Sequence, residues 1–208
     1  MTNKEGCGNV TTRIERPDYR MLAAIACLTA ALAVLMCLPA GPVKAQTILG
    51  LDDPMIEAIQ DGNLDRVKSL VIQGGNPSIT SVDGMNGIGI AARNGDYAML
   101  DYLIQVDVPV NNSDDIGNTP LHWITEDGDY DIAGYLLDNG ANVNVTNRNG
   151  MTPVMIATRE GFVDLVDLYI DHGADLGVRD YTGRSVLDWA RGSRAPGLEQ
   201  LLIDAGAQ

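Results

Sequence analysis

From about residue 51 onward, short apolar segments with helical spacing alternate with polar, glycine-containing turns. Leu121 and Ile124 lie three residues apart, so they share one face of a short helix predicted over 120–125. Gly128 interrupts this pattern, and a second helix is predicted over 129–138. Three apolar residues share the inner face of the second segment: Ile132, Tyr135 and Leu136. The pattern predicts pairs of short helices with almost no sheet.

The turns return with a period of 33 residues. Three residue series keep that spacing over four or five periods, and they are glycine throughout except at Asp107. Self-similarity at a fixed period of this length indicates tandem repeats that stack to bury a shared core. The series are Gly62, Gly95, Gly128 and Gly161; Gly84, Gly117, Gly150 and Gly183; and Gly74, Asp107, Gly140, Gly173 and Gly206.

A short motif opens the first helix of each repeat. Residues 119–122 (TPLH) align in this register with 152–155 (TPVM) and 185–188 (SVLD). Thr119 and Thr152 are good helix N-caps, and each is followed by a proline, which fits the first helical turn because its missing N–H is not needed there. Gly140 is expected to end the second helix in a left-handed conformation.

These motifs resemble those of the ankyrin repeat family, and the resemblance covers nearly all of the chain beyond residue 50. The T-P-L-H signature, the glycine between the helices and the G-A-x-V-N ending recur in phase. The resemblance implies an all-α ankyrin-repeat solenoid of about five 33-residue helix–turn–helix repeats with short hairpin-like loops. The incomplete first and last repeats fit the role of caps. The repeats are assigned to about 51–78, 79–111, 112–144, 145–177 and 178–208.

Repeat 79–111 departs from the pattern in two ways. Asp107 replaces the terminal glycine, so it must take a positive φ at modest cost, and an irregular turn is expected before Pro109. Gly87 and Gly89 fall within the first helix, which predicts a soft, poorly formed helix. The same segment, residues 87–92, imitates a dinucleotide-binding fingerprint. No βαβ unit surrounds it, so the repeat register is the better interpretation.

The first 45 residues have the pattern of a secretory signal peptide, which leaves 46–208 as the repeat domain. An uncharged run over 21–38 follows four basic residues, and Val43-Lys44-Ala45 places small residues before a cleavage point after Ala45. An uncleaved membrane anchor is one alternative, because 18 residues just reach spanning length. A lipoprotein is another, although Met36 is bulky at a position where that processing prefers a small residue. Each reading exports the repeats from the cytoplasm.

Composition narrows the possible functions. The net charge is −14, which argues against nucleic acid as a partner because phosphate binding needs a basic surface. All three cysteines lie in the first 45 residues, so the repeats cannot form wrong disulfides in an oxidising compartment. With only two histidines, the chain has little material for a catalytic or metal site. We therefore expect no enzyme, no cofactor and no metal.

Three local features have structural explanations. Residues 127–131 begin like a calcium loop but lack the later glycine and glutamate, so helix capping by Asp129 is the better account and weak calcium binding the alternative. His122 has no second histidine, cysteine or triad partner in its segment, and the resemblance implies that it links neighbouring hairpins by hydrogen bonds. Trp123 and Trp189 are predicted to pack in the core rather than to stack on a ligand.

Ankyrin-like repeats bind partners through hairpin tips and first helices on a concave side, and the resemblance carries those positions to this chain. Five arginines fall there, whereas many acidic residues fall on second helices. Arg148, Arg159 and Arg179 are predicted to lie close together and to meet an acidic or mixed patch on a partner. The candidate partner-binding residues are Met85, Arg93, Asp115, Ile116, Glu126, Asp127, Arg148, Asn149, Met151, Arg159, Arg179, Tyr181 and Arg184.

The sequence thus favours a non-catalytic protein–protein interaction module of the bacterial envelope, most simply periplasmic and monomeric alone. It would bind or stabilise a protein partner through the concave face. The alternative is a secreted effector that binds a host protein. Membrane association is expected only if the signal segment stays uncleaved. The glycosylation sequons at Asn111 and Asn144 leave a eukaryotic secretory origin open.

Overall fold

The computed structural model describes residues 53–193 and 195–208. The predicted signal segment, its cleavage point after Ala45 and the uncharged run over 21–38 lie outside these residues. In the described part there are ten helices, no strands, and two isolated β-bridges, Thr80–Asn86 and Arg179–Ser185. None of these helices is long and apolar enough to cross a membrane. The helices are α2 (Pro54–Gln60), α3 (Leu64–Ile72), α4 (Gly87–Arg93), α5 (Tyr97–Gln105), α6 (Pro120–Asp127), α7 (Tyr130–Asp138), α8 (Pro153–Glu160), α9 (Val163–Asp171), α10 (Val186–Gly192) and α11 (Leu198–Asp204).

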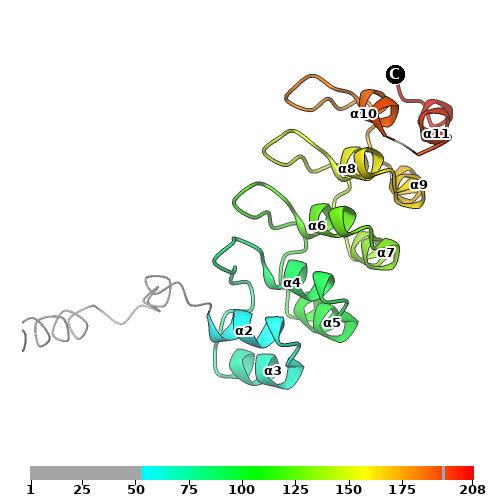
Figure 1. Ribbon diagram of the computed structural model, residues 1–208. Coiled ribbons are helices and arrows are strands. Elements are labelled where there is room, and N and C mark those ends of the chain that lie inside the picture. Colours follow the sequence, from blue (N-terminus) through cyan, green and yellow to red (C-terminus); the bar gives the residue numbers. More distant parts are fainter. Residues whose placement is uncertain (1–52, 194) are drawn as a thin grey trace, which may run out of the picture. The chain divides into compact units, whose positions relative to one another are not determined.

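Successive helices form five pairs that stack along one direction. The first helices of the pairs (α2, α4, α6, α8 and α10) contact one another in a continuous row, and each packs against the second helix of its own pair. Figure 1 shows the second helices on one side of this row and the long connecting loops, here called hairpins, on the other. The predicted all-α repeat solenoid is therefore confirmed.

The core runs along the row of first helices. The amphipathic spacing seen in the sequence explains it, because the apolar face of each helix meets those of its neighbours. Leu121, Ile124, Ile132 and Leu136 are all buried, as the helical spacing predicts. Tyr169 of α9 is fully buried too, and its hydroxyl lies 2.6 Å from the Thr125 hydroxyl of α6. This buried polar pair links two successive helix pairs.

Short polar side chains cap three of the second helices. Asn63, Asp96 and Asp129 are the N-caps of α3, α5 and α7, and each accepts a hydrogen bond from the backbone N–H three residues later. For Asp129 the donor is Ile132 N, at 3.0 Å. The prediction that Asp129 is a helix cap is thus confirmed.

Asp107 has φ 60°, the only positive φ of a non-glycine residue in the described chain, as its register position predicted. The expectation of an irregular turn was wrong. The N–H groups of Asp107 and Val108 donate to Ile104 O and Leu103 O, both at 3.0 Å. Gly140 ends its own helix with the same two-bond arrangement, so the aspartate adopts the geometry of the glycine it replaces.

The expectation of a poorly formed α4 was also wrong, because its helix is regular and every residue before Arg93 is buried. Asn86 caps it by accepting from Gly89 N at 2.9 Å, and its amide donates to Pro109 O of the next hairpin. A Cβ at Gly87 would lie 2.8 Å from the Ile59 side chain. The glycine therefore allows α4 to pack closely on α2. The expectation from the low helix propensity of glycine did not include this packing.

Candidate functional site

The TPLH motif builds a buried hydrogen-bond network between two repeats. His122 is fully buried, and its Nδ1 accepts from Thr119 N at 3.1 Å. Its Nε2 faces Met151 O of the next hairpin at 3.2 Å and donates to it. Burial lowers the pKa of His122, which favours this neutral form. The implied role of His122 as a structural link between repeats is confirmed.

The next repeat has the same cap but lacks the histidine. Met155 stands at the equivalent position and is buried. The hydroxyl of Thr152 is buried as well, and no residue of the described chain bonds it. The prediction that Thr152 is an N-cap is right about its position, but its side chain makes no capping bond. The orphaned hydroxyl thus marks the loss of one link in the stack.

The hairpins stack directly on one another through their backbones. Arg148 N donates to Ile116 O, and one repeat later Tyr181 N donates to Asn149 O, both at 3.0 Å. Gly150 takes φ 74° beneath Tyr181, and a Cβ on it would lie 2.8 Å from Tyr181 N. The hairpins and the first helices together form a surface that we call the inner surface.

Two tryptophans lie on the inner surface. Their indole N–H groups donate to hairpin carboxylates, Trp123 to Asp114 at 2.9 Å and Trp189 to Asp180 at 3.1 Å. Both side chains are half-buried, and the predicted packing against the core is found for Trp189. Burial by itself raises the pKa of Asp180, but hydrogen bonds from Thr182, Arg184 and Trp189 outweigh it, and the net result is a lowered pKa. The indole of Trp189 is therefore held in place by an ionised carboxylate.

The sequence contains a signal for these pairs that the motif search missed. The hairpin position of Asp114 and the helix position of Trp123 change together from repeat to repeat. Aspartate accompanies tryptophan in the third and fifth pairs, whereas Ser81 or Asn147 accompanies isoleucine in the second and fourth. The indole therefore appears only where a carboxylate is present to accept its N–H.

Charges on the inner surface pair across repeats. Arg93 lies 3.1 Å from Asp127, and Arg159 lies 3.8 Å from Glu126 and 2.7 Å from Glu160. The acidic residues Glu126 and Asp127 are thus partly neutralised by arginines of the neighbouring repeats. These pairs are exposed or half-exposed, so each contributes about 0–1 kcal/mol to stability.

Most of the predicted partner-binding residues are exposed on hairpins or at the ends of first helices. Met151 is a correction, because it is buried and its carbonyl belongs to the His122 network. Met85 and Arg159 are half-buried. The exposed members are Arg93, Asp115, Ile116, Glu126, Asp127, Arg148, Asn149, Arg179, Tyr181 and Arg184.

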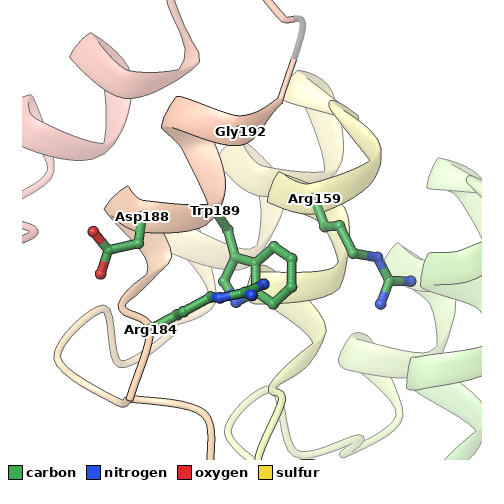
Figure 2. Close-up of a pocket in the computed structure, with 5 residues that line it drawn as sticks. All are labelled: Arg159, Arg184, Asp188, Trp189 and Gly192. Carbon is green, nitrogen blue, oxygen red and sulfur yellow. The ribbon is translucent and has the colours of Figure 1, made fainter. Parts of the chain in front are cut away.

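A hollow of about 510 Å³ opens on the inner surface between α8 and α10. Figure 2 shows Arg184 lying across the face of Trp189, whereas the side chain of Arg159 extends from α8 away from the indole. The guanidinium of Arg184 is 4.6 Å from the centre of the indole ring. Arg159 and Arg184 both line the hollow, whereas Arg148 and Arg179 do not. Its lining residues are Arg159, Arg184, Asp188, Trp189 and Gly192.

Within residues 53–193 and 195–208, no three His, Cys, Asp or Glu side chains are grouped so that they could hold a metal ion.

The fold and this surface define a class, the α-helical repeat solenoids that present stacked loops. The chain belongs to the ankyrin repeat family: the family model described as "Ankyrin repeats (3 copies)" matches residues 55–147 and 141–208. Ankyrin repeats generally mediate protein–protein interactions and are typically non-catalytic binding modules.

Proposed function

We propose that this chain is a non-catalytic protein-binding module of the bacterial envelope that binds or stabilises one protein partner. The observation that carries the proposal is the composition of the inner surface. It displays arginine, tyrosine and tryptophan, the residue types that contribute most often to binding hot spots. Tyr181 is 76% exposed at a hairpin tip, and Ile116 is 52% exposed at another. Such side chains gain contact area when a partner covers them.

The non-catalytic part of the proposal is supported by the chemistry of His122. Its two ring nitrogens are both occupied by structural hydrogen bonds, and burial keeps substrate away from it. Asp180 and Asp188, whose pKa values are lowered, serve their own hairpin and helix N-terminus. These groups are used for structure, which leaves the exposed hairpin tips to act by binding.

The export signal read at residues 1–45 supports an envelope location. The sequons offer no reason to prefer a glycosylated, eukaryotic chain. The amide of Asn111 donates to Gly140 O at 2.9 Å, and that of Asn144 donates to Gly173 O at 3.1 Å. A glycan on either nitrogen would disturb a contact between repeats.

Fractionation of bacterial cells that express the full chain separates the envelope module from the secreted effector. Immunoblotting should find a product shortened by about 45 residues in the periplasmic fraction. Accumulation in the medium would favour the effector that binds a host protein. Retention of the full-length chain in the cytoplasm would contradict both.

A matched pair of double variants tests the inner surface. Arg148→Glu with Tyr181→Ala changes two hairpin tips, and we expect it to reduce capture of the envelope partner at least about tenfold. Arg66→Glu with Tyr130→Ala makes the same two replacements at exposed positions of the second helices α3 and α7. This control should capture the same protein as the unmodified chain, as judged by quantitative mass spectrometry of pull-downs.

All four positions are exposed, so both variants should keep the melting temperature nearly unchanged. If the control variant loses the partner and the hairpin variant keeps it, the second helices form the binding surface. The proposal for the inner surface would then be wrong.

A further inference from the structure

The hollow beside Trp189 combines an aromatic face with two guanidinium groups. We propose that it is a subsite for a carboxylate side chain, glutamate or aspartate, on an acidic segment of the protein partner. This inference rests on the proposed function, because it assigns one part of the partner to one part of the inner surface.

The local charge of the hollow is opposite to that of the whole chain. The net charge of the chain is −14, yet Arg159 and Arg184 are two of the three charged residues that line the hollow. Among the residues that the structure describes, no carboxylate forms an ion pair with Arg184, and its guanidinium lies over the indole. A guanidinium that is not neutralised has an open place for a two-pronged bond to a carboxylate.

The acidic residue of the hollow, Asp188, is occupied by its own helix. It accepts from Ser185 N at 2.9 Å and lies 3.3 Å from Arg191 and 3.8 Å from Arg179. In Figure 2 its carboxylate is directed to the side opposite Arg159. Arg159 is already paired with Glu160 at 2.7 Å, so Arg184 is the lining guanidinium that is left to bind an anion.

The floor of the hollow is fixed. Asp180 holds the indole of Trp189 through its N–H, so the ring is ready to support Arg184 in one orientation. A pre-ordered guanidinium loses less conformational entropy when it binds a ligand. At the edge of the hollow, a Cβ on Gly192 would meet nothing within 4 Å, which leaves room for a side chain of a partner.

Trp123 provides an internal reference. It has the same hairpin carboxylate, and Arg93 lies over its ring at 5.4 Å. Arg93, however, is already paired with Asp127 at 3.1 Å. The two sites differ in the origin of the arginine, which is the preceding first helix at Trp123 and the hairpin of the same repeat at Trp189, and in its pairing. Because only the arginine at Trp189 lacks a carboxylate, only that site should bind an acid.

The chain has only two tryptophans, so their indole N–H signals give a direct NMR readout. The ¹⁵N-labelled protein produced from the full chain is titrated with a peptide of four glutamates with neutral ends, and with the matching glutamine peptide. The glutamate peptide should shift the Trp189 signal with saturation on the order of 1 mM, the affinity of a few exposed ion pairs. The Trp123 signal should not move.

Two variants test the chemistry and the place separately. Arg184→Gln removes the free charge and should abolish the shift. Gly192→Phe fills the open space without a steric clash and should also abolish it. Gly134→Phe on α7 is the matched control, because a Cβ there also meets nothing within 4 Å, and it should leave the titration unchanged.

The inference is overturned if the glutamine peptide acts equally well, if both indoles shift together, or if no saturable shift occurs below about 10 mM. It is also overturned if Gly192→Phe binds like the unmodified protein. These failures are separate from that of the proposed function. If the Arg148→Glu/Tyr181→Ala variant loses the partner but the Trp189 signal does not respond to the peptide, the inner surface remains the proposed binding surface and only this subsite is wrong.

Discussion

Replacing His122 by methionine is expected to lower the free energy of unfolding by about 2 kcal/mol. The substitution copies into one repeat the arrangement that the next repeat has naturally, where Met155 accompanies an orphaned Thr152 hydroxyl. Thr119 would then lose the acceptor of its N–H, and Met151 O would lose one of its donors. Methionine fills much of the space of the imidazole, so the loss comes mainly from unpaired polar groups. Urea denaturation at pH 7.5 measures it.

The reverse replacement, Met155→His, is the complementary variant. A histidine there places a nitrogen beside the Thr152 hydroxyl and directs its other nitrogen toward Arg184 O, the counterpart of Met151 O. We expect a gain of about 1 kcal/mol, because the new bonds offset the loss of buried methionine contacts. If His122→Met is neutral, the network contributes nothing net to stability. If Met155→His destabilises the fold, the missing histidine does not explain the orphaned hydroxyl.

The unmodified protein and the His122→Met variant should also differ in how their free energy of unfolding depends on pH. Burial lowers the pKa of His122, so the unfolded chain takes up a proton at a higher pH than the folded chain does. Above about pH 6.5 the histidine is neutral in both the folded and the unfolded state, so its protonation does not change the free energy of unfolding. Below that pH, stability should fall by up to about 1.4 kcal/mol per pH unit until the folded pKa is reached. His172 is exposed and present in both proteins, so the slope lost in His122→Met belongs to His122.

The fold could be predicted from the sequence because its determinants are local. Caps, prolines and glycines recur every 33 residues, and each acts within a few residues of its own position. The helix expected over 120–125 extends over Pro120–Asp127, and the one expected over 129–138 is Tyr130–Asp138. Even the positive φ of Asp107 follows from its register alone.

The features that the sequence did not predict depend on contacts between repeats. Whether Gly87 weakens α4 depends on how closely Ile59 approaches it, and that distance is a property of the stack. Met151 is predicted as a hairpin residue but is buried, because it directly precedes Thr152, the N-cap of α8. The pairing of Arg93 with Asp127 joins residues 34 positions apart, so a register of single repeats does not reveal it. The exposure of most candidate residues could therefore be predicted from the sequence, but the pairing of their charges could not.

Replacement of Gly150 by alanine is expected to cost about 3 kcal/mol of stability, whereas the same change at Gly183 should cost about 1 kcal/mol. Both glycines have left-handed backbones, with φ 74° and 86°, so both substitutions pay the same conformational penalty. They differ in what lies above them. A Cβ at Gly150 would lie 2.8 Å from Tyr181 N, whereas at Gly183 it would meet nothing within 4 Å.

The difference between the two variants therefore measures the stacking of hairpin on hairpin. The clash at Gly150 involves the ring of Tyr181 as well, at 2.6 Å, and a side chain could rotate away. The backbone N–H cannot, since it is bonded to Asn149 O at 3.0 Å. Gly150→Ala should consequently cost nearly as much in a Tyr181→Ala background as in the unmodified protein. Urea denaturation of the unmodified protein, the three single variants and the double variant measures these costs. Equal costs at Gly150 and Gly183 would mean that the hairpins separate freely, and the inner surface would then lack the rigid backbone that we ascribe to it.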